Sequence, residues 1–161
     1  MTRAVIAFGA NLDDREATIA AAVREIAEAS GVELVAVSPV YETAAIKHHG
    51  VDADAPRYLN GVVVVETLLE PHALLELLQR IELEHGRVRT EHWGDRTLDL
   101  DLIDVAGVVL DDERLTLPHP RAWQRAFVLA PWLDVDPEAE LTGRGPIAAL
   151  RAAAADEVVR R

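Results

Sequence analysis

Residues 98–102 read Leu-Asp-Leu-Asp-Leu, and this alternation constrains the fold more than any other feature of the chain. Successive side chains of a strand point to opposite faces. The three leucines therefore share one face, while Asp99 and Asp101 share the other. Because the leucine face requires a packed core, the sequence predicts a sheet strand that presents two carboxylates on its opposite side.

Composition narrows the class of protein. Half of the 161 residues are hydrophobic, so we expect a single domain over residues 1–161 with a real core. The chain has no cysteine, which excludes disulfides and thiolate chemistry. Apolar runs are far shorter than the roughly 20 residues that a bilayer requires. The start also lacks the pattern of a secretory signal. We therefore expect a soluble cytoplasmic protein that binds no membrane. We also expect a monomer.

Charge is distributed unevenly along the chain. The formal net charge of −12 argues against nucleic-acid binding, because phosphate backbones are held by basic surfaces. Nevertheless, Arg87, Arg89 and Arg96 lie within ten residues of one another. Such a cluster in an acidic protein favours binding of a small anion, although a solvated loop of mixed charge explains it equally well.

Hydrophobic periodicity, caps and turn residues predict the order β-α-β-β-α-β. The expected strands cover 3–9, 32–42, 58–67 and the Leu/Asp stretch, followed by a hairpin strand at 108–110 with a turn at 111–112. Four helices are expected. The first ends near Ser30, the second runs from Pro71 to Gly86, the third follows the 114–122 loop, and the last covers 147–158. Ile19, Val23 and Ile26 form the buried stripe of the first helix, and 43–57 is a long loop.

This order is that of the ferredoxin-like split βαβ arrangement. We therefore expect an α/β (α+β) fold: a ferredoxin-like βαββαβ core whose mostly antiparallel sheet is packed by helices, with C-terminal additions. A fold alone does not name an activity.

The carboxylate pair and the arginine cluster together favour a metal–phosphate site. Carboxylates at i and i+2 of a strand can converge on a hard cation such as Mg²⁺, which takes a few carboxylates together with substrate phosphates. Nearby arginines would then neutralise polyphosphate oxygens. An acidic solvent-exposed strand face is the alternative for Asp99 and Asp101. Neither glycine-rich phosphate motif occurs, so any ATP would be held by arginines and metal.

Taken together, the motifs resemble the 6-hydroxymethyl-7,8-dihydropterin pyrophosphokinase family. They are GANL (9–12), YET (41–43), YLN (58–60), QRIELEHGRVR (79–89), WGDRTLDLDLI (93–103), RLTLPHPRA (114–122) and RAFVLAPW (125–132). The resemblance extends over roughly residues 3–150 in the family's order, and 86–101 is its most specific part.

The resemblance implies a diphosphotransferase of folate biosynthesis. Such an enzyme moves diphosphate from ATP to the hydroxymethyl group of the dihydropterin and releases AMP. Its only partners would be these two small-molecule substrates, with two Mg²⁺ ions held by Asp99 and Asp101. Loops 43–57 and 86–96 would close over the bound substrates.

The resemblance also implies a set of site residues. Those assigned to catalysis are Arg87, Arg96, Asp99 and Asp101. Those assigned to ATP are Gln79, Glu82, Arg87, Arg89, Trp93, Arg96, Ile103, Arg114, Thr116 and His119. Those assigned to the pterin are Thr43, Ala44, Ile46, Tyr58, Asn60, Asp99, Arg125 and Phe127, with the two aromatic rings on either side of the heterocycle.

Two other classes of function compete with this interpretation. The first is another Asp-x-Asp metal enzyme, such as a nucleotidyl- or glycosyltransferase. The second is a non-catalytic ferredoxin-like module that binds a small ligand. Product analysis separates the first class, because the pyrophosphokinase must give AMP together with a diphosphorylated pterin. The binding module would bind its ligand without consuming ATP, and Asp99→Ala with Asp101→Ala would leave that binding largely intact.

Overall fold

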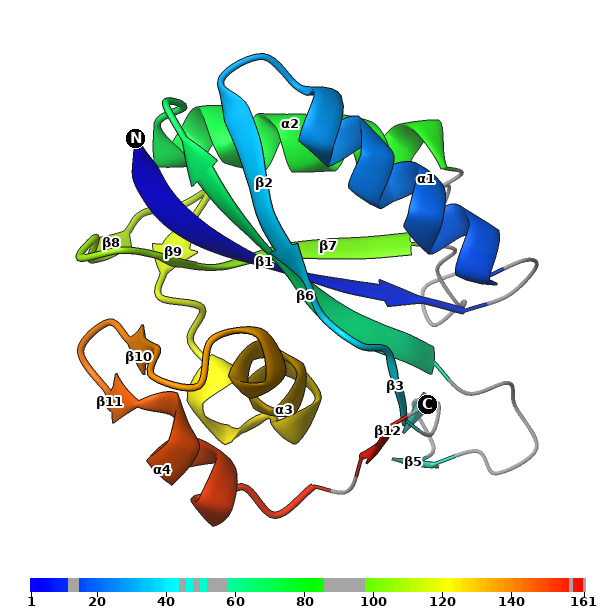
Figure 1. Ribbon diagram of the computed structural model, residues 1–161, viewed down its shortest axis with the longest axis vertical. Helices are drawn as coiled ribbons and strands as arrows, with labels where there is room; N and C mark the ends of the chain where they lie inside the picture. Colours follow the sequence, from blue (N-terminus) through cyan, green and yellow to red (C-terminus); the bar gives the residue numbers. More distant parts are fainter. Residues whose placement is uncertain are drawn as a thin grey trace.

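The main sheet is built from strands that lie far apart in the sequence (Figure 1). A computed structural model describes residues 1–11, 15–43, 46–47, 50–51, 58–85, 98–156 and 158–160. The strands of the sheet are β1 (Thr2–Ala10), β2 (Val32–Val37), β3 (Tyr41–Thr43), β6 (Tyr58–Thr67), β7 (Leu98–Val105) and β12 (Val159–Arg160). Their order is β12-β3-β6-β1-β7, with β2 also paired to β6, and these pairings are antiparallel.

Helices cover both faces of this sheet (Figure 1). They are α1 (Arg15–Glu28), α2 (Pro71–Glu84), the short 3₁₀ turn η1 (Ala122–Gln124), α3 (Ala126–Val135) and α4 (Ile147–Ala153). Small strand pairs also occur: β4 (Ile46–Lys47) with β5 (Gly50–Val51), β8 (Leu110–Asp111) with β9 (Thr116–Leu117), and β10 (Glu140–Leu141) with β11 (Gly145–Pro146).

The first face packs against α1 and α2. Leu98, Leu100 and Leu102 are buried there in one core with residues of both helices, which confirms the expected leucine face. The neighbouring strands β1 and β6 add alternate residues to the same core, and the segments β1-α1-β2/β3-β6-α2-β7 follow the split βαβ order. The expected fold class is therefore confirmed, with β1 between β6 and β7.

The second face is covered by the C-terminal additions, namely η1, α3, α4 and the β10–β11 hairpin (Figure 1). Val5, Val62 and Val64 of the sheet pack here against buried residues of α3 such as Leu129 and Trp132. These additions leave part of the face uncovered at the end of the sheet where β1 ends and where β6 and β7 begin, and the candidate site lies there.

A β-bulge in β7 changes which side chains reach this second face. Ile6 pairs with Leu102 and Val5 with Asp104, so Ile103 is an extra residue without a counterpart on β1. Ile103 packs in the second core, and Asp104 accepts a hydrogen bond at 3.1 Å from the backbone N–H of Thr142 in the β10–β11 turn. The strict alternation of faces therefore continues through Ile103 and ends there, because Asp104 lies on the same face as Ile103.

The expected strand over 32–42 was wrong as one continuous element. It divides into β2 and β3, because Pro39 has no N–H to donate and Ser38 takes over the pairing with β6. The Ser38 N–H donates to the Val62 carbonyl at 2.9 Å, and the Ser38 hydroxyl accepts from the Val62 N–H at 2.8 Å.

The last helix is shorter than expected. Its prediction over 147–158 rested on alanine-rich propensity, but α4 ends at Ala153 and Ala154 is extended. Tertiary contacts override the propensity, since Val159 and Arg160 pair with β3.

Three smaller expectations also differ from the structure. The buried stripe of α1 uses Ala22 in addition to Ile19 and Ile26, with Val23 only partly buried. The hairpin strand after β7 begins at Leu110, and its turn covers 112–115. Part of the 43–57 loop forms β4 and β5. Among the described residues, no helix is long and apolar enough to cross a membrane.

Candidate active site

A cavity of about 230 Å³ lies on the second face, where β1, β6 and β7 meet the start of α3. Its lining residues come from five segments: Ala7, Phe8, Gly9, Thr43, Tyr58, Asn60, Asp99, Asp101, Arg125 and Phe127. Strand register brings several of them together, because Gly9 of β1 lies between Asn60 of β6 and Asp99 of β7. The cavity therefore gathers acidic, amide, cationic and aromatic groups in one place.

The two aspartates of the Leu/Asp strand both line this cavity. Asp99 is half-buried and Asp101 is exposed. Small residues face them on β1, where Gly9 pairs with Asp99 and Ala7 with Asp101, which leaves space above the carboxylates. Sharing a cavity is the arrangement expected of two groups that bind the same ligand, whereas an acidic face serving only solubility requires no cavity.

The donor set fits magnesium bound together with a phosphate ligand. Within the described ranges, no three His, Cys, Asp or Glu side chains form a metal-binding group, so the protein here offers a pair of carboxylates. Mg²⁺ commonly takes one or two carboxylates and fills its remaining positions with water and substrate phosphate oxygens. Asp99 and Asp101 therefore match a site that is completed by substrate.

Asn60 is held in place at the floor of the cavity. It is 8% exposed, and its side-chain amide donates to the Thr43 hydroxyl at 2.8 Å. A Cβ atom at Gly9 would lie 3.1 Å from the Asn60 side-chain oxygen, so glycine at position 9 leaves room for this amide. The contact between Asn60 and Thr43 fixes which end of the amide faces β3.

Two of the aromatic residues that line the cavity, Tyr58 and Phe127, come from elements on different sides of it. Tyr58 begins β6, Phe127 lies in the first turn of α3, and both are half-buried. The Arg125 guanidinium carbon is 5.3 Å from the centre of the Phe127 ring, within the range of a cation–π contact. Burial and the neighbouring Arg121 lower the pKa of Arg125, while Asp101 and Asp156 act in the opposite direction.

His119 lies beside the carboxylate pair and near two arginines. Its backbone N–H donates to the Ile103 carbonyl at 2.8 Å, which fixes the loop to β7. Its ring Nδ1 accepts the Arg121 backbone N–H at 3.2 Å, so a neutral ring carries its proton on Nε2. Burial, together with Arg125 and Arg121, lowers the pKa of His119 although Asp101 raises it. In its neutral form His119 therefore offers an N–H donor at Nε2.

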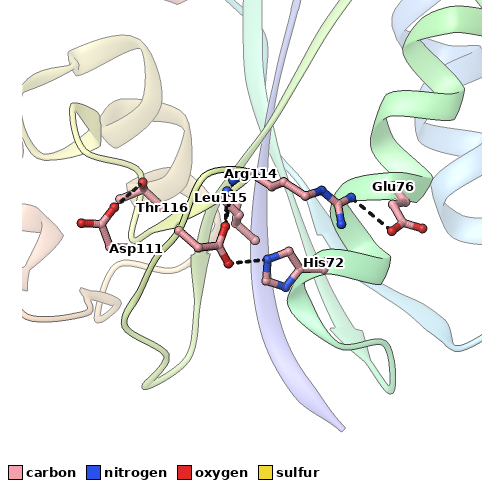
Figure 2. Close-up of polar contacts among 7 residues, drawn as sticks. His72, Glu76, Asp111, Arg114, Leu115 and Thr116 are labelled. Carbon is pink, nitrogen blue, oxygen red and sulfur yellow. Dashed lines mark hydrogen bonds and ion pairs between the residues drawn. The ribbon is translucent and has the colours of Figure 1, made fainter.

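Arg114 and Thr116 lie outside this cavity: the Arg114 side chain reaches toward α2, whereas Thr116 lines a separate pocket together with His119 and Trp123. The Arg114 guanidinium contacts the Glu76 carboxylate of α2 at 3.1 Å, and the Thr116 hydroxyl donates to Asp111 at 3.2 Å (Figure 2). Both side chains are thus oriented by partners on neighbouring elements.

The turn that carries Arg114 is organised by Asp112. One oxygen of Asp112 accepts the backbone N–H groups of Arg114 and Leu115 at 2.8 and 2.9 Å. Its other oxygen is 2.7 Å from Nε2 of His72 in the first turn of α2 (Figure 2). The N–H of Arg114 lowers the pKa of Asp112, and burial acts weakly against it. One carboxylate therefore fixes the turn to α2.

The other ATP-assigned residues in the described chain lie at different depths. Glu82 is 4% exposed and accepts the Leu100 N–H at 2.8 Å. Ile103 is 1% exposed, so its side chain lies beneath the surface. Its backbone carbonyl accepts the hydrogen bond from the His119 N–H. Gln79 is exposed on α2.

Several expected site residues lie outside the described residues: Ala44, Arg87, Arg89, Trp93 and Arg96. Ile46 is described only as part of β4. The proposed closure of 43–57 and 86–96 falls largely on the same segments.

The cavity also contains residues that sequence reasoning did not assign. Ala7, Phe8 and Gly9 line it from β1. Small residues on a central strand, flanked on both sides by strands with polar side chains, are the signal that would have identified this wall.

Comparisons with known proteins place the whole chain. A model of the 7,8-dihydro-6-hydroxymethylpterin-pyrophosphokinase family matches residues 5–137. A 2-amino-4-hydroxy-6-hydroxymethyldihydropteridine pyrophosphokinase of Methylorubrum extorquens is 40% identical over 143 residues, covering 89% of this chain and 88% of the relative. A protein of the same name from Pseudomonas aeruginosa is 41% identical over 159 residues, covering 99% and 96%.

Solved structures share the fold. A crystal structure of the Plasmodium falciparum HPPK-DHPS protein matches with a TM-score of 0.69 at 15% identity, covering 94% of this chain. The present chain spans 45% of the length of that protein. At this identity the likeness shows the fold alone.

Proposed function

The chain belongs to the 7,8-dihydro-6-hydroxymethylpterin-pyrophosphokinase family, and from that premise we propose that its cavity binds the pterin while Asp99 and Asp101 bind magnesium with ATP. The protein is a diphosphotransferase, a pyrophosphokinase of folate biosynthesis. The observation that carries the site assignment is the cavity itself. Its lining combines the carboxylate pair with Asn60, Tyr58 and Phe127.

The pterin is a flat heterocycle with a polar edge, and the cavity offers groups suited to both. Tyr58 and Phe127 provide ring faces from separate elements, and each aromatic pair adds about 0.5–1.5 kcal/mol beyond burial. Asn60 offers its side-chain oxygen and its second N–H to the pterin edge, since one N–H of its amide donates to Thr43. Arg125 lies over Phe127 and adds positive charge where the hydroxymethyl end approaches the phosphates.

The residues that act on ATP would combine charge neutralisation with positioning. Magnesium, two ions in our expectation, would neutralise phosphate oxygens and make the phosphorus more electrophilic. His119 would donate from Nε2 to a phosphate oxygen, and Arg125 and Arg121 would add positive charge nearby. Arg114 and Thr116 would contact the adenosine, Arg114 from the α2 side and Thr116 from the pocket that it shares with His119. Arg87, Arg89, Trp93 and Arg96 would complete the phosphate site, with Arg87 and Arg96 in catalysis.

The proposed step is an in-line displacement. The pterin hydroxymethyl oxygen attacks the β-phosphorus of ATP, and the bond from that phosphorus to the α,β-bridging oxygen breaks. AMP leaves with the bridging oxygen, and the hydroxyl proton is released. We assign no side chain as general base, since positioning supplies most of the acceleration in such transfers.

We also propose that the protein acts as a cytoplasmic monomer with one domain and small-molecule partners only. The net charge of −12 supports the expectation that it binds no nucleic acid. Analytical ultracentrifugation of the purified protein, which measures its molecular mass in solution, tests the expected monomeric state.

Product identification tests the function. The protein is incubated with ATP, Mg²⁺ and 6-hydroxymethyl-7,8-dihydropterin, and the nucleotides are separated. We expect AMP and a diphosphorylated pterin in equal amounts. ADP would indicate a simple kinase, and binding without ATP consumption would indicate a ligand-binding module; both results contradict the proposal.

A double variant tests the metal site. Asp99→Asn together with Asp101→Asn should lower turnover on the order of 1,000-fold, the scale seen when a charge-stabilising group is lost. Far-UV circular dichroism and the melting temperature should stay close to wild type, because Asp101 is exposed and Asp99 half-buried. Glu138→Gln, an exposed carboxylate outside the cavity, is the control. Retained turnover in the double variant would refute this site.

A further inference from the structure

The first turn of α3 carries two residues of the cavity wall, and its cap comes from elsewhere in the chain. Arg125 is the N-cap residue and Phe127 is the second helical residue, with Ala126 between them. Within the described chain, Arg125 makes no side-chain hydrogen bond that caps the helix. A cap is therefore needed from another segment, because the first N–H groups of a helix lack partners within it.

Asp156 supplies this cap. Both of its carboxylate oxygens lie 2.9 Å from the Ala126 nitrogen, so the Ala126 N–H donates to Asp156 across 30 positions of sequence. The carboxylate is also close enough to Arg125 to affect its pKa, in the direction that favours the charged guanidinium. Asp156 lies beyond residue 137, where the match to the family model ends.

The segment around Asp156 also reaches the opposite wall of the cavity. Val159 and Arg160 form β12, which pairs with Glu42 and Tyr41 of β3 (Figure 1). The next residue of β3 is Thr43, which holds Asn60. Asp156 and β12 therefore contact both elements that flank the pterin-assigned residues.

The two walls are also joined directly. The Tyr41 hydroxyl of β3 donates to Asp134 of α3 at 2.5 Å. Burial, reinforced by Asp134, raises the pKa of Tyr41 to about 12, so the donor stays protonated under all ordinary conditions. The Tyr41–Asp134 contact therefore fixes β3 to the C-terminal half of α3, while Asp156 holds the first turn of the same helix.

We propose that Asp156 is a positioning residue for the pterin: by capping α3 at Ala126, it holds Arg125 and Phe127 in place against Tyr58 and Asn60. This inference rests on the proposed function of the cavity. Asp156 does not line the cavity itself, so it acts through the turn that it caps.

The test compares Asp156→Ala with Asp156→Asn in the full-length protein. Alanine removes the cap, whereas asparagine keeps one oxygen acceptor and is as good an N-cap as aspartate. We expect Asp156→Ala to raise KM for the dihydropterin about 5-fold, with KM for ATP within 2-fold of wild type. At 1.4 kcal/mol per tenfold this is roughly 1 kcal/mol, the usual value of an N-cap. Asp156→Asn should restore KM to within 2-fold.

Three results would overturn the proposal. An unchanged pterin KM in Asp156→Ala would show that the cap does not affect the site. Equal impairment in Asp156→Asn and Asp156→Ala would show that the charge near Arg125 matters and the cap does not. Parallel loss of ATP and pterin affinity would show a general weakening of the fold. Glu138→Ala, another exposed carboxylate of the C-terminal region, is the matched control.

Amide hydrogen exchange separates this inference from the function on which it rests. The Ala126 amide should be protected in the wild type and in Asp156→Asn, and should exchange at least 5-fold faster in Asp156→Ala. If the wild type released no AMP, the proposed function would fail while the exchange result still reported on the cap. If the wild type released AMP and Ala126 exchanged equally in all variants, the positioning role alone would fail.

Discussion

At the scale of single residues, two glycines shape this site because they leave room for neighbouring side chains. Gly61 lies opposite Phe8 across β1 and β6, and a Cβ atom there would overlap the Phe8 ring and lie 2.8 Å from the Ser38 hydroxyl. Gly9 similarly leaves room for Asn60. Because neither glycine has a positive φ angle, their role is close approach of neighbouring groups rather than backbone freedom.

Asp104 gives a prediction at the same scale. It is 5% exposed, and burial raises the pKa of its carboxyl group, although hydrogen bonds from Thr142 act against the shift. A folded-state pKa above the unfolded value means that the native protein binds the proton more tightly. Asp104 therefore stabilises the fold below its ordinary pKa near 3.8, and this stabilisation is lost as pH rises through the folded-state pKa.

Asp104→Asn should remove this pH dependence. Asparagine keeps the oxygen that accepts the Thr142 N–H and removes the buried charge. We expect the free energy of unfolding to rise by about 1 kcal/mol at pH 7, with the gain shrinking as the pH falls toward 4. Urea titrations at several pH values measure it. A variant that is destabilised at pH 7, or a gain that is independent of pH, would contradict this account.

At the scale of elements, β7 is positioned from two sides. It pairs with β1 along one edge, and at the other edge the buried Glu82 of α2 accepts the Leu100 N–H at 2.8 Å. This contact satisfies a strand-edge donor between Asp99 and Asp101. The helix therefore fixes the part of the strand that bears the carboxylate pair, a structural role for a residue that the family resemblance assigned to ATP.

Glu82 variants test this contact. Glu82→Leu leaves the Leu100 N–H without its acceptor and should lower the free energy of unfolding by about 1–3 kcal/mol. Glu82→Gln keeps a carbonyl oxygen and should lose less than half of that. Leu83→Ala, at a position 65% exposed on the same helix, controls for changes in helix propensity. Equal stability of the Leu and Gln variants in urea titrations would show that the hydrogen bond contributes nothing.

The same elements show which parts of the fold can be predicted from the sequence. The strand expected at 58–67 is β6 over the same residues, because turn residues bound a continuous apolar run. The last helix was predicted too long, because local propensity contains no information about Asp156 and β12 reaching α3 and β3. The sequence also did not predict the bulge at Ile103, because the apolar residues that follow Leu102 are compatible with either face of the sheet.

At the scale of the whole molecule, the candidate site forms only when four strands of the sheet and the start of α3 come together. The Leu/Asp alternation and the motifs predicted the acidic pair, Tyr58, Asn60, Arg125 and Phe127, and these now share one cavity. Their use of pterin, ATP and magnesium stays a prediction. The wall formed by β1 was not predicted, because it depends on the strand order β6-β1-β7, which places Gly9 between Asn60 and Asp99.

This dispersed construction predicts how a ligand stabilises the protein. Because the cavity is lined by β1, β3, β6, β7 and α3, global unfolding destroys it, and the pterin should bind only the folded state. At a free concentration of 100 Kd, binding should add about 2.7 kcal/mol to the free energy of unfolding. For a domain of this size that corresponds to an increase in melting temperature of roughly 5–10 °C.

Thermal unfolding at increasing dihydropterin concentration, with saturating Mg²⁺ and a non-hydrolysable ATP analogue, measures this shift. Phe127→Ala should require a higher concentration for the same increase, because a half-buried ring face is lost while the rest of the cavity remains. Leu68→Ala, at a position 69% exposed after β6, should follow the wild-type curve. A shift that is identical in Phe127→Ala and wild type would place the pterin elsewhere, since binding in this cavity must lose affinity when the Phe127 ring is removed.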